Sequence, residues 1–348
     1  MKADSKYISY LDGLRGYAIL LVLLGHYYVL KMAFAQFGVT LFFFVSGFLI
    51  TKLLIYEYDK YHKVHLKEFY LRRVFRLYPA LIFMIVLYSA AIVLNGYKLI
   101  VGDVVSGLFY YTNYYLIYVK PVIPDEKYLL MSRVLWSLSV EEHFYLLFPL
   151  LFMFLFPKKR LVTLIVALLP IFIIVRSLSG RDFLPIYATT HCRADSILYG
   201  CLSALLIYGH ASKWYIQLLN NKKTLYLGVA VLVFALLFRN KFFQNNLAFT
   251  FQGLGLTLFI PSFLFGNADS IFKRIIDNKV IVYIGKLSYS LYLFHWVAMQ
   301  MIVFYYPEKS LNWYLLVVPL SFLLAIASYY FVEKPFVALR RKFGSHAK

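Results

Sequence analysis

An arginine and a histidine lie within one stretch of membrane-spanning length, Leu11 to Tyr28. Arg15 and His26 are separated by ten residues, so in a helix they lie on one face, roughly 16 Å apart along the axis. An imidazole exchanges a proton near neutral pH, which suits general acid–base chemistry. Ionisable groups inside a bilayer are costly and indicate a functional site. The alternative is a snorkelling arginine together with an interfacial histidine.

Further polar side chains are expected at nearly the same depth as His26. They come from four other apolar segments, which contain FFFVSGFLI, LWSLSVEEHFYLLFP, HCRADS and LSYSLYLFHW. The candidate residues are Ser46, Trp136, Ser139, Glu141, Glu142, His143, Arg193, Asp195, Ser288, Tyr289 and His295. Because five segments place His, Glu, Asp, Arg and Ser in one layer, we interpret the layer as a site.

Several of these residues also have a structural explanation. Arg193 and Asp195 could form an ion pair, and Ser46 could pack helices beside Gly47. His295, which lies level with His26 when residues are counted from the cytoplasmic side, could be a satisfied core histidine.

Glu142 is better placed than Glu141 to face a site. On a helical wheel, one polar stripe is formed by Trp136, Ser139 and His143. Glu142 flanks this stripe, whereas Glu141 points nearly to the opposite side.

A second candidate site is a cluster of three arginines. The sequence EFYLRRVFRLYPA places Arg72, Arg73 and Arg76 just before Pro79, where we expect a helix to begin. Guanidinium groups bind phosphate through paired hydrogen bonds, so the cluster suits a multiply phosphorylated ligand. It could equally follow the positive-inside rule or contact anionic lipid.

The elements that must position these residues are membrane helices. The chain has 348 residues, 62% of them hydrophobic and 15% charged, and apolar runs of membrane length recur from end to end. This indicates an all-α polytopic membrane protein, with one integral domain over 1–348. The first run shows no signal-peptide cleavage site and is interpreted as a spanning helix. The two cysteines form no CxxC pattern, so we expect no metal site.

We expect ten spans and one apolar segment, 104–119, that is re-entrant or lies at the membrane surface. The spans cover 12–30, 38–56, 79–94, 135–156, 161–179, 193–209, 224–238, 249–266, 281–304 and 313–332. This topology places 23 lysines and arginines in cytoplasmic segments and 9 in outer loops, and makes both termini cytoplasmic. The net charge of +20 therefore reflects membrane orientation rather than nucleic-acid binding. The tyrosines of 104–119 suit an interfacial aromatic belt or stacking on a sugar ring.

Seven motifs in sequence order resemble those of the acyltransferase-3 family of integral membrane acyltransferases. They are DGLRGYAILLVLLGH, FFFVSGFLI, YLRRVFRLYPA, LWSLSVEEHFYLLFPL, RADSILYGCL, LSYSLYLFHW and YYFVEKPF, and they cover nearly the whole chain. The resemblance implies that Arg15 and His26 form the family's Arg-X10-His pair, with His26 catalytic. It also implies that Arg72, Arg73 and Arg76 form the RRxxR motif thought to hold the phosphates of coenzyme A.

The resemblance assigns Glu141 and Glu142 to the family's acidic pair. His143 departs from the pattern, because glutamine is expected there, and it adds a third titratable group beside the glutamates. The chain shows no SGNH hydrolase-like domain of the kind that some members carry. We therefore expect the transfer to be completed in the membrane domain or by a separate protein.

The expected reaction is O-acetyl transfer from acetyl-CoA to a hydroxyl of a surface or lipid-linked carbohydrate, such as lipopolysaccharide O-antigen, at the inner (cytoplasmic) membrane. His26 would take the hydroxyl proton and Glu142 would orient its ring, with coenzyme A on arginines about 20 Å away. The remaining polar residues would bind the acceptor. The expected partners are the carbohydrate or glycolipid, acyl-CoA and the bilayer, without a metal or nucleic acid. A sugar-lipid transporter or flippase is the competing function, and a covalent acyl-enzyme and the oligomeric state stay open.

Overall fold

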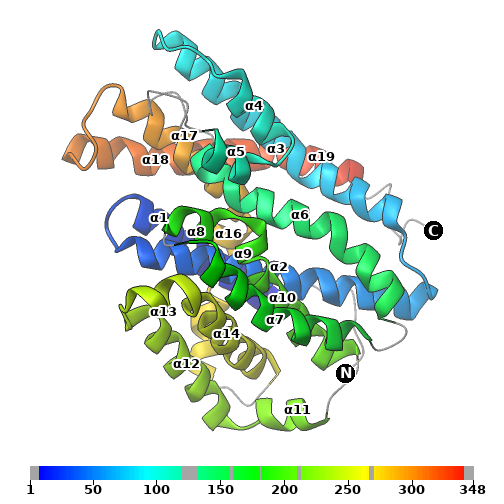
Figure 1. The fold of residues 1–348 in the computed structure, drawn as a ribbon. Helices are drawn as coiled ribbons and strands as arrows, with labels where there is room; N and C mark the ends of the chain where they lie inside the picture. The colour runs from blue at the N-terminus through cyan, green and yellow to red at the C-terminus, as the bar shows by residue number, and fades with distance from the viewer. Residues whose placement is uncertain are drawn as a thin grey trace. The chain divides into compact units, whose positions relative to one another are not determined.

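The computed structural model describes residues 8–119, 132–156, 160–180, 182–209, 213–265 and 270–340. Every regular element in these ranges is a helix, and several are long and apolar, so the predicted all-α polytopic membrane fold is confirmed (Figure 1). The ends of the chain, which we predict to be cytoplasmic, lie outside the described residues, as do Lys158 and Lys159.

The chain divides into two compact units, each assembled from segments that are far apart in the sequence. The first unit comprises Met1–Gly25, Leu30–Val64 and His143–Lys286, and the remainder forms the second. The chain therefore passes from one unit to the other within helix α1 (Ser9–His26) and within helix α6 (Ser132–Leu155).

The first unit contains most of the helices. Its long elements are α2 (Met32–Tyr61), α7 (Arg160–Leu178), α10 (Asp195–Ala204) with a π-helical turn (Leu205–Gly209), α12 (Lys222–Leu237) and α14 (Ala248–Phe265). Its short helices are α8 (Phe183–Ala188), α9 (Thr190–Arg193), α11 (Lys213–Leu219), α13 (Lys241–Asn246), α15 (Ser270–Ile276) and α16 (Lys279–Lys286). Helix α2 packs on α10, and α12 packs on α14 (Figure 1).

The second unit contains His26 and the arginine cluster. Its helices are α3 (Leu66–Leu94), α4 (Val101–Leu108), α5 (Thr112–Tyr118), the first part of α6, α17 (Ser288–Val303), α18 (Leu311–Ala327) with a π-helical turn (Ser328–Glu333), and α19 (Lys334–Arg340). Helix α17 packs along α18, and α3 packs on α19.

Five helices of the described chain are long and apolar enough to cross a membrane, or six if α16 and α17 form one broken span. The five are Met32–Tyr61, Leu66–Leu94, Arg133–Leu155, Arg160–Leu178 and Leu311–Leu339. Each of the ten predicted spans coincides with one helix or with consecutive helices. The count of ten crossings itself stays a prediction.

The predicted start of a helix at Pro79 is wrong. Helix α3 begins at Leu66, so Pro79 lies inside it and the arginine cluster lies within its first three turns. Proline is favoured at the first position of a helix because it lacks an N–H, but membrane helices also tolerate it in their interior. Composition alone does not separate these two positions.

Segment 104–119 folds as two short helices, α4 and α5, of eight and seven residues. At about 1.5 Å per residue each is roughly 10–12 Å long, far short of a hydrocarbon core of ~30 Å. Tyr110 between them has a φ of 55°, in the left-handed region, where the chain turns from one helix to the next. The segment thus agrees with the expectation that it does not cross.

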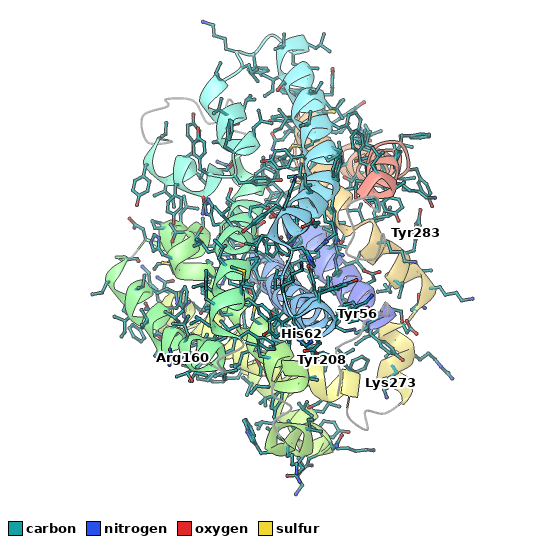
Figure 2. The ribbon with its side chains drawn as sticks, turned by 90° about the vertical axis from the view of Figure 1, so that its right-hand side faces the viewer. Tyr56, His62, Arg160, Tyr208, Lys273 and Tyr283 are labelled. Atoms are coloured by element: carbon teal, nitrogen blue, oxygen red, sulfur yellow. The ribbon has the colours of Figure 1, made fainter. Side chains whose placement is uncertain are left out.

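The segment between the predicted spans 38–56 and 79–94 is mostly helical, because α2 continues to Tyr61 and α3 begins at Leu66. Lys52, only 2% exposed, places its ammonium nitrogen 5.6 Å from the centre of the Tyr208 ring, in the π-helical turn after α10. Figure 2 labels Tyr208, Tyr56 of α2, and His62, which comes directly after the end of α2. A cation over an aromatic face keeps part of its electrostatic stabilisation when it is desolvated, which suits a lysine buried in α2.

Glycines allow α2 and α10 to approach closely. A Cβ atom at Gly200 would lie 2.0 Å from the backbone oxygen of Phe44, and one at Gly47 would lie 2.1 Å from that of Ile197. Neither oxygen can move without its helix. Small residues at the contacts of membrane helices serve this purpose, because association there depends on close packing rather than on exclusion of water.

Gly200→Ala is therefore expected to destabilise the protein by about 1–3 kcal/mol, because the two helix backbones must separate. The measurement is thermal unfolding in detergent, followed by tryptophan fluorescence. Gly107→Ala in α4 is the matched control, since its Cβ would meet only the side-chain ends of Leu135 and Ile85. Equal losses for the two variants would show that the α2–α10 contact does not need glycine.

Candidate functional site

The structure brings His26 and His295 into direct contact. His26 is the last residue of α1 and His295 lies in α17, and both belong to the second unit. Nδ1 of His26 is 2.9 Å from Nε2 of His295. The ring centres are 5.2 Å apart and the planes differ by 6°. That separation is about the largest that such an N···N distance allows, so the rings lie end to end in one plane, as an N–H···N hydrogen bond requires.

Aromatic rings surround His295. The rings of Tyr27, Tyr292 and Trp296 have their centres 6.4, 5.9 and 6.4 Å from that of His295. His295 is fully buried, whereas His26 is partly exposed. Of the two histidines, His26 is therefore accessible and His295 is not.

Hydrogen bonds fix the positions of two of these aromatic rings, those of Tyr292 and Tyr27. The Tyr292 hydroxyl donates to the carbonyl of Val134 at 2.9 Å, so the hydroxyl of Ser137 donates to Tyr292 at 2.6 Å. The Tyr27 hydroxyl donates to Ser321 in α18 at 2.7 Å. Three helices of the second unit, α6, α17 and α18, thus fix the surroundings of the two histidines.

Glu142 lies in the same environment as the arginines of α3. The charges of Arg73 and Arg76 act on its carboxyl group, together with that of Glu141. Oε1 of Glu142 is buried without a hydrogen-bond partner in the part of the chain that the structure describes. The acidic pair is thereby joined to the arginine cluster.

Glu142 belongs to the predicted outer layer, yet the charges of Arg73 and Arg76 act on it. The predicted separation of about 20 Å between His26 and the arginines stays a prediction. Among the described residues, the side-chain hydrogen-bond partner of His26 is His295, not Glu142.

Tyr289 lies beside this acidic and basic group. Its hydroxyl donates to the carbonyl of Leu77, one residue after Arg76, at 2.8 Å, and Tyr110 and Glu142 both act on it electrostatically. The neighbouring Ser288 is buried, and its hydroxyl has no hydrogen-bond partner in the described ranges.

The polar residues at the start of α6 are buried. Trp136 is 6% exposed, and Ser139 donates to the carbonyl of Leu135 in its own helix at 3.1 Å. This bond is a local one, and it explains why a serine is tolerated there. The predicted role of both residues in acceptor binding stays a prediction.

Other candidates belong to the first unit. Ser46 hydrogen-bonds to Tyr145, and Nδ1 of His143 is 2.7 Å from the hydroxyl oxygen of Thr190. Arg15 forms a long ion pair of 3.7 Å with Asp12, one turn earlier in α1. The structure therefore confirms that Arg15 and His26 share one unbroken helix, but Arg15 is occupied by a local partner.

The ion pair of Asp195 is made by Arg176, not by Arg193. Nη1 of Arg176 is 2.6 Å from Oδ2 of Asp195, and both side chains are fully buried. Arg176 also donates to the carbonyls of Cys192 and Asn246. It thus ties α7 to α9, α10 and α13.

Sequence reasoning missed Arg176, although a single arginine near the end of the apolar segment 160–178 is the usual sign of a buried partner. Arg193 is buried too, with its guanidinium 3.6 Å from the centre of the Phe249 ring and Nη2 donating to Thr40 at 3.0 Å. The surroundings of Arg193 are chiefly aromatic, so Arg193 does not form the ion pair with Asp195 that Arg176 forms.

No group of three or more His, Cys, Asp or Glu residues in the described ranges could hold a metal ion.

A comparison with known families matches nearly the whole chain. A family model described as an acyltransferase domain matches residues 8–330, nearly the whole chain. The chain belongs to the acyltransferase-3 family. This confirms the resemblance carried by the seven ordered motifs, and it places both the histidine pair and the arginine cluster inside the acyltransferase-3 domain.

Relatives of this acyltransferase-3 domain occur in Staphylococcus aureus. The O-acetyltransferase OatA of strain NCTC 8325 / PS 47 is 31% identical, over 99% of this chain and 60% of that protein. OatA of strain MRSA252 is 32% identical, over 95% and 57%. The putative O-acetyltransferase SACOL0978 of strain COL is 31% identical, over 95% and 57%. The chain thus spans about three fifths of the length of these relatives, and no solved structure matches it.

Proposed function

We propose that this protein transfers an acetyl group from acetyl-CoA to a hydroxyl of a cell-surface or lipid-linked carbohydrate. The observation that carries the proposal is the end-to-end pair of His26 and His295, with His26 partly exposed. A family of acyltransferases and relatives named O-acetyltransferases give the reaction class. We place the protein in the cytoplasmic membrane with both chain ends in the cytoplasm, because this orientation puts most lysines and arginines on the cytoplasmic side.

In the proposed reaction His26 acts as the general base. Its free nitrogen takes the proton of the acceptor hydroxyl while that oxygen attacks the carbonyl carbon of the thioester. The C–O bond forms, the C–S bond breaks, and the proton passes from the imidazolium to the departing thiolate. The products are the acetyl ester and free coenzyme A, and no other reactant is needed.

We assign the donor phosphates to Arg72, Arg73 and Arg76. Three guanidiniums within five residues of one helix present many donors on one side, which suits a ligand with several phosphates. Glu142 then serves as a positioning residue for this cluster, because its carboxyl group is under the influence of Arg73 and Arg76 rather than bonded to His26.

The test is transfer of labelled acetyl from acetyl-CoA by the purified protein in nanodiscs, with a lipid-linked glycan extract and soluble oligosaccharides as acceptors. We expect ester-linked label in a carbohydrate, released by mild alkali. Absence of acetyl-CoA binding by the folded protein, up to millimolar concentration, would replace this proposal with sugar-lipid transport.

Changing Arg72, Arg73 and Arg76 together to glutamine is expected to weaken acetyl-CoA binding by at least about 100-fold, since each charged hydrogen bond contributes on the order of 1.5–3 kcal/mol. Calorimetric titration with acetyl-CoA measures this. The matched control changes Lys273 and Arg274, two basic residues of α15 in the first unit, to glutamine. A similar loss in the control would mean that overall positive charge, not this cluster, binds the donor.

A further inference from the structure

The hydrogen bonds of His295 determine which of its nitrogens carries a proton. Nδ1 of His295 is 3.0 Å from the carbonyl oxygen of Leu291, one turn earlier in α17. A carbonyl oxygen only accepts hydrogen bonds. Nδ1 of His295 must therefore carry the hydrogen.

The other nitrogen of His295 is then an acceptor, provided that the ring is neutral. The ring is fully buried among Tyr27, Tyr292 and Trp296. Among the described residues, the hydrogen-bond partners of the ring are His26 and the Leu291 carbonyl, and neither is a carboxylate. A buried imidazole without an acidic partner stays uncharged, because burial opposes the charged form. Nε2 of His295 thus presents a lone pair to His26.

We infer that His295 is a positioning residue, which holds His26 in the tautomer that carries its hydrogen on Nδ1 and leaves Nε2 free to accept a proton. This inference rests on the proposed acetyl transfer, and it identifies His295 as the residue that orients the base, His26, for that reaction. The chain of contacts runs from the Leu291 carbonyl to His295 and on to His26. The Leu291 carbonyl and the neutral His295 ring thus orient His26 and fix its tautomer, as an aspartate does for the histidine of a serine protease.

The same contacts bear on the charged state of the base. When Nε2 of His26 takes the acceptor proton, Nδ1–H of the imidazolium still donates to the lone pair of His295, so no bond has to be remade. The ring also stays in the plane of its partner, and Nε2 keeps its direction. This prior arrangement reduces the reorganisation that accompanies proton transfer.

The test compares His295→Gln with His295→Asn, two amides that differ by one methylene. The glutamine carbonyl oxygen can reach the place of Nε2 and accept from His26, whereas the asparagine carbonyl reaches only the place of Nδ1. We expect kcat for acetyl transfer to fall by about 100-fold or more in His295→Asn and by less than about tenfold in His295→Gln, with KM for acetyl-CoA unchanged in both. A purely structural role would affect the two variants alike.

A second measurement does not depend on turnover. ¹⁵N spectra of histidine-labelled protein in nanodiscs distinguish protonated from unprotonated ring nitrogens, and His26→Gln identifies the His26 signals. We expect Nδ1–H and bare Nε2 in the wild type, with mixed tautomers in His295→Asn. A wild-type His26 that carries its hydrogen on Nε2 would overturn the inference, and so would equal activity of the glutamine and asparagine variants. Lack of any acetyl transfer by the wild type would instead refute the proposed function, while the spectra would still decide the tautomer.

Discussion

Replacing His26 by alanine is expected to lower the rate of acetyl transfer by about 1,000-fold, within the range that a positioned general base contributes. Binding of acetyl-CoA should change by less than about threefold, because the arginines that we assign to the donor lie on α3, a different helix. The experiment measures labelled acetyl transfer and calorimetric binding on the same nanodisc preparation. A loss of rate without a loss of binding is the signature of a group that acts in the transition state.

His62→Asn is the matched control for this experiment. His62 follows α2 with a φ of 53°, a conformation that asparagine also adopts readily, and its side chain is exposed. We expect its activity to stay within about twofold of the wild type, as for other surface substitutions. Full activity of His26→Ala would exclude a base at this position. Loss of acetyl-CoA binding in His26→Ala would show that the residue holds the donor rather than the proton.

Arg176→Met is expected to destabilise the protein by about 3–5 kcal/mol, because it leaves the carboxylate of Asp195 buried and unpaired. Both side chains are fully buried, so neither can recover its hydration without opening the first unit. Thermal unfolding in detergent, or loss of monodisperse protein during purification, would report the effect.

The control for Arg176→Met is the double variant Arg176→Met, Asp195→Leu. When both members of a buried ion pair are replaced by apolar groups, the loss is much smaller than when one is removed. We expect the double variant to recover most of the stability lost in Arg176→Met. If the double variant were no more stable than the single one, the hydrogen bonds from Arg176 to backbone carbonyls would be the main contribution.

The positions of the helices could be predicted well from the sequence because apolar length is the dominant signal in a membrane protein. The ends of helices were less accessible. Pro79 is compatible with the start or the interior of a helix, and only the packing of α3 shows that it lies inside. Similarly, the predicted span 38–56 ends at Tyr56, but α2 continues to Tyr61.

The types of the candidate site residues and their depths in the membrane could be predicted from the sequence. Which of these residues contact one another could not. Counting residues from the cytoplasmic side put His26 and His295 at one level, and the structure shows them hydrogen-bonded. The same counting put Glu142 at nearly the depth of His26, but it did not show that the charges of Arg73 and Arg76 act on this carboxyl group. Depth leaves the rotation and neighbours of each helix open, and these follow from tertiary packing.

The place of His26 as the last residue of α1 has an electrostatic consequence. The carbonyls of a final helical turn point outward, and the aligned peptide dipoles give that end about half a negative charge. A cation there is stabilised by about 0.3–1 kcal/mol, and by more where water is excluded. Asp12, in the first turn of the same helix, matches the opposite, positive end. In the reaction that we propose, the backbone of α1 would therefore act as a counter-ion for the His26 imidazolium, which would reduce the need for a carboxylate beside it.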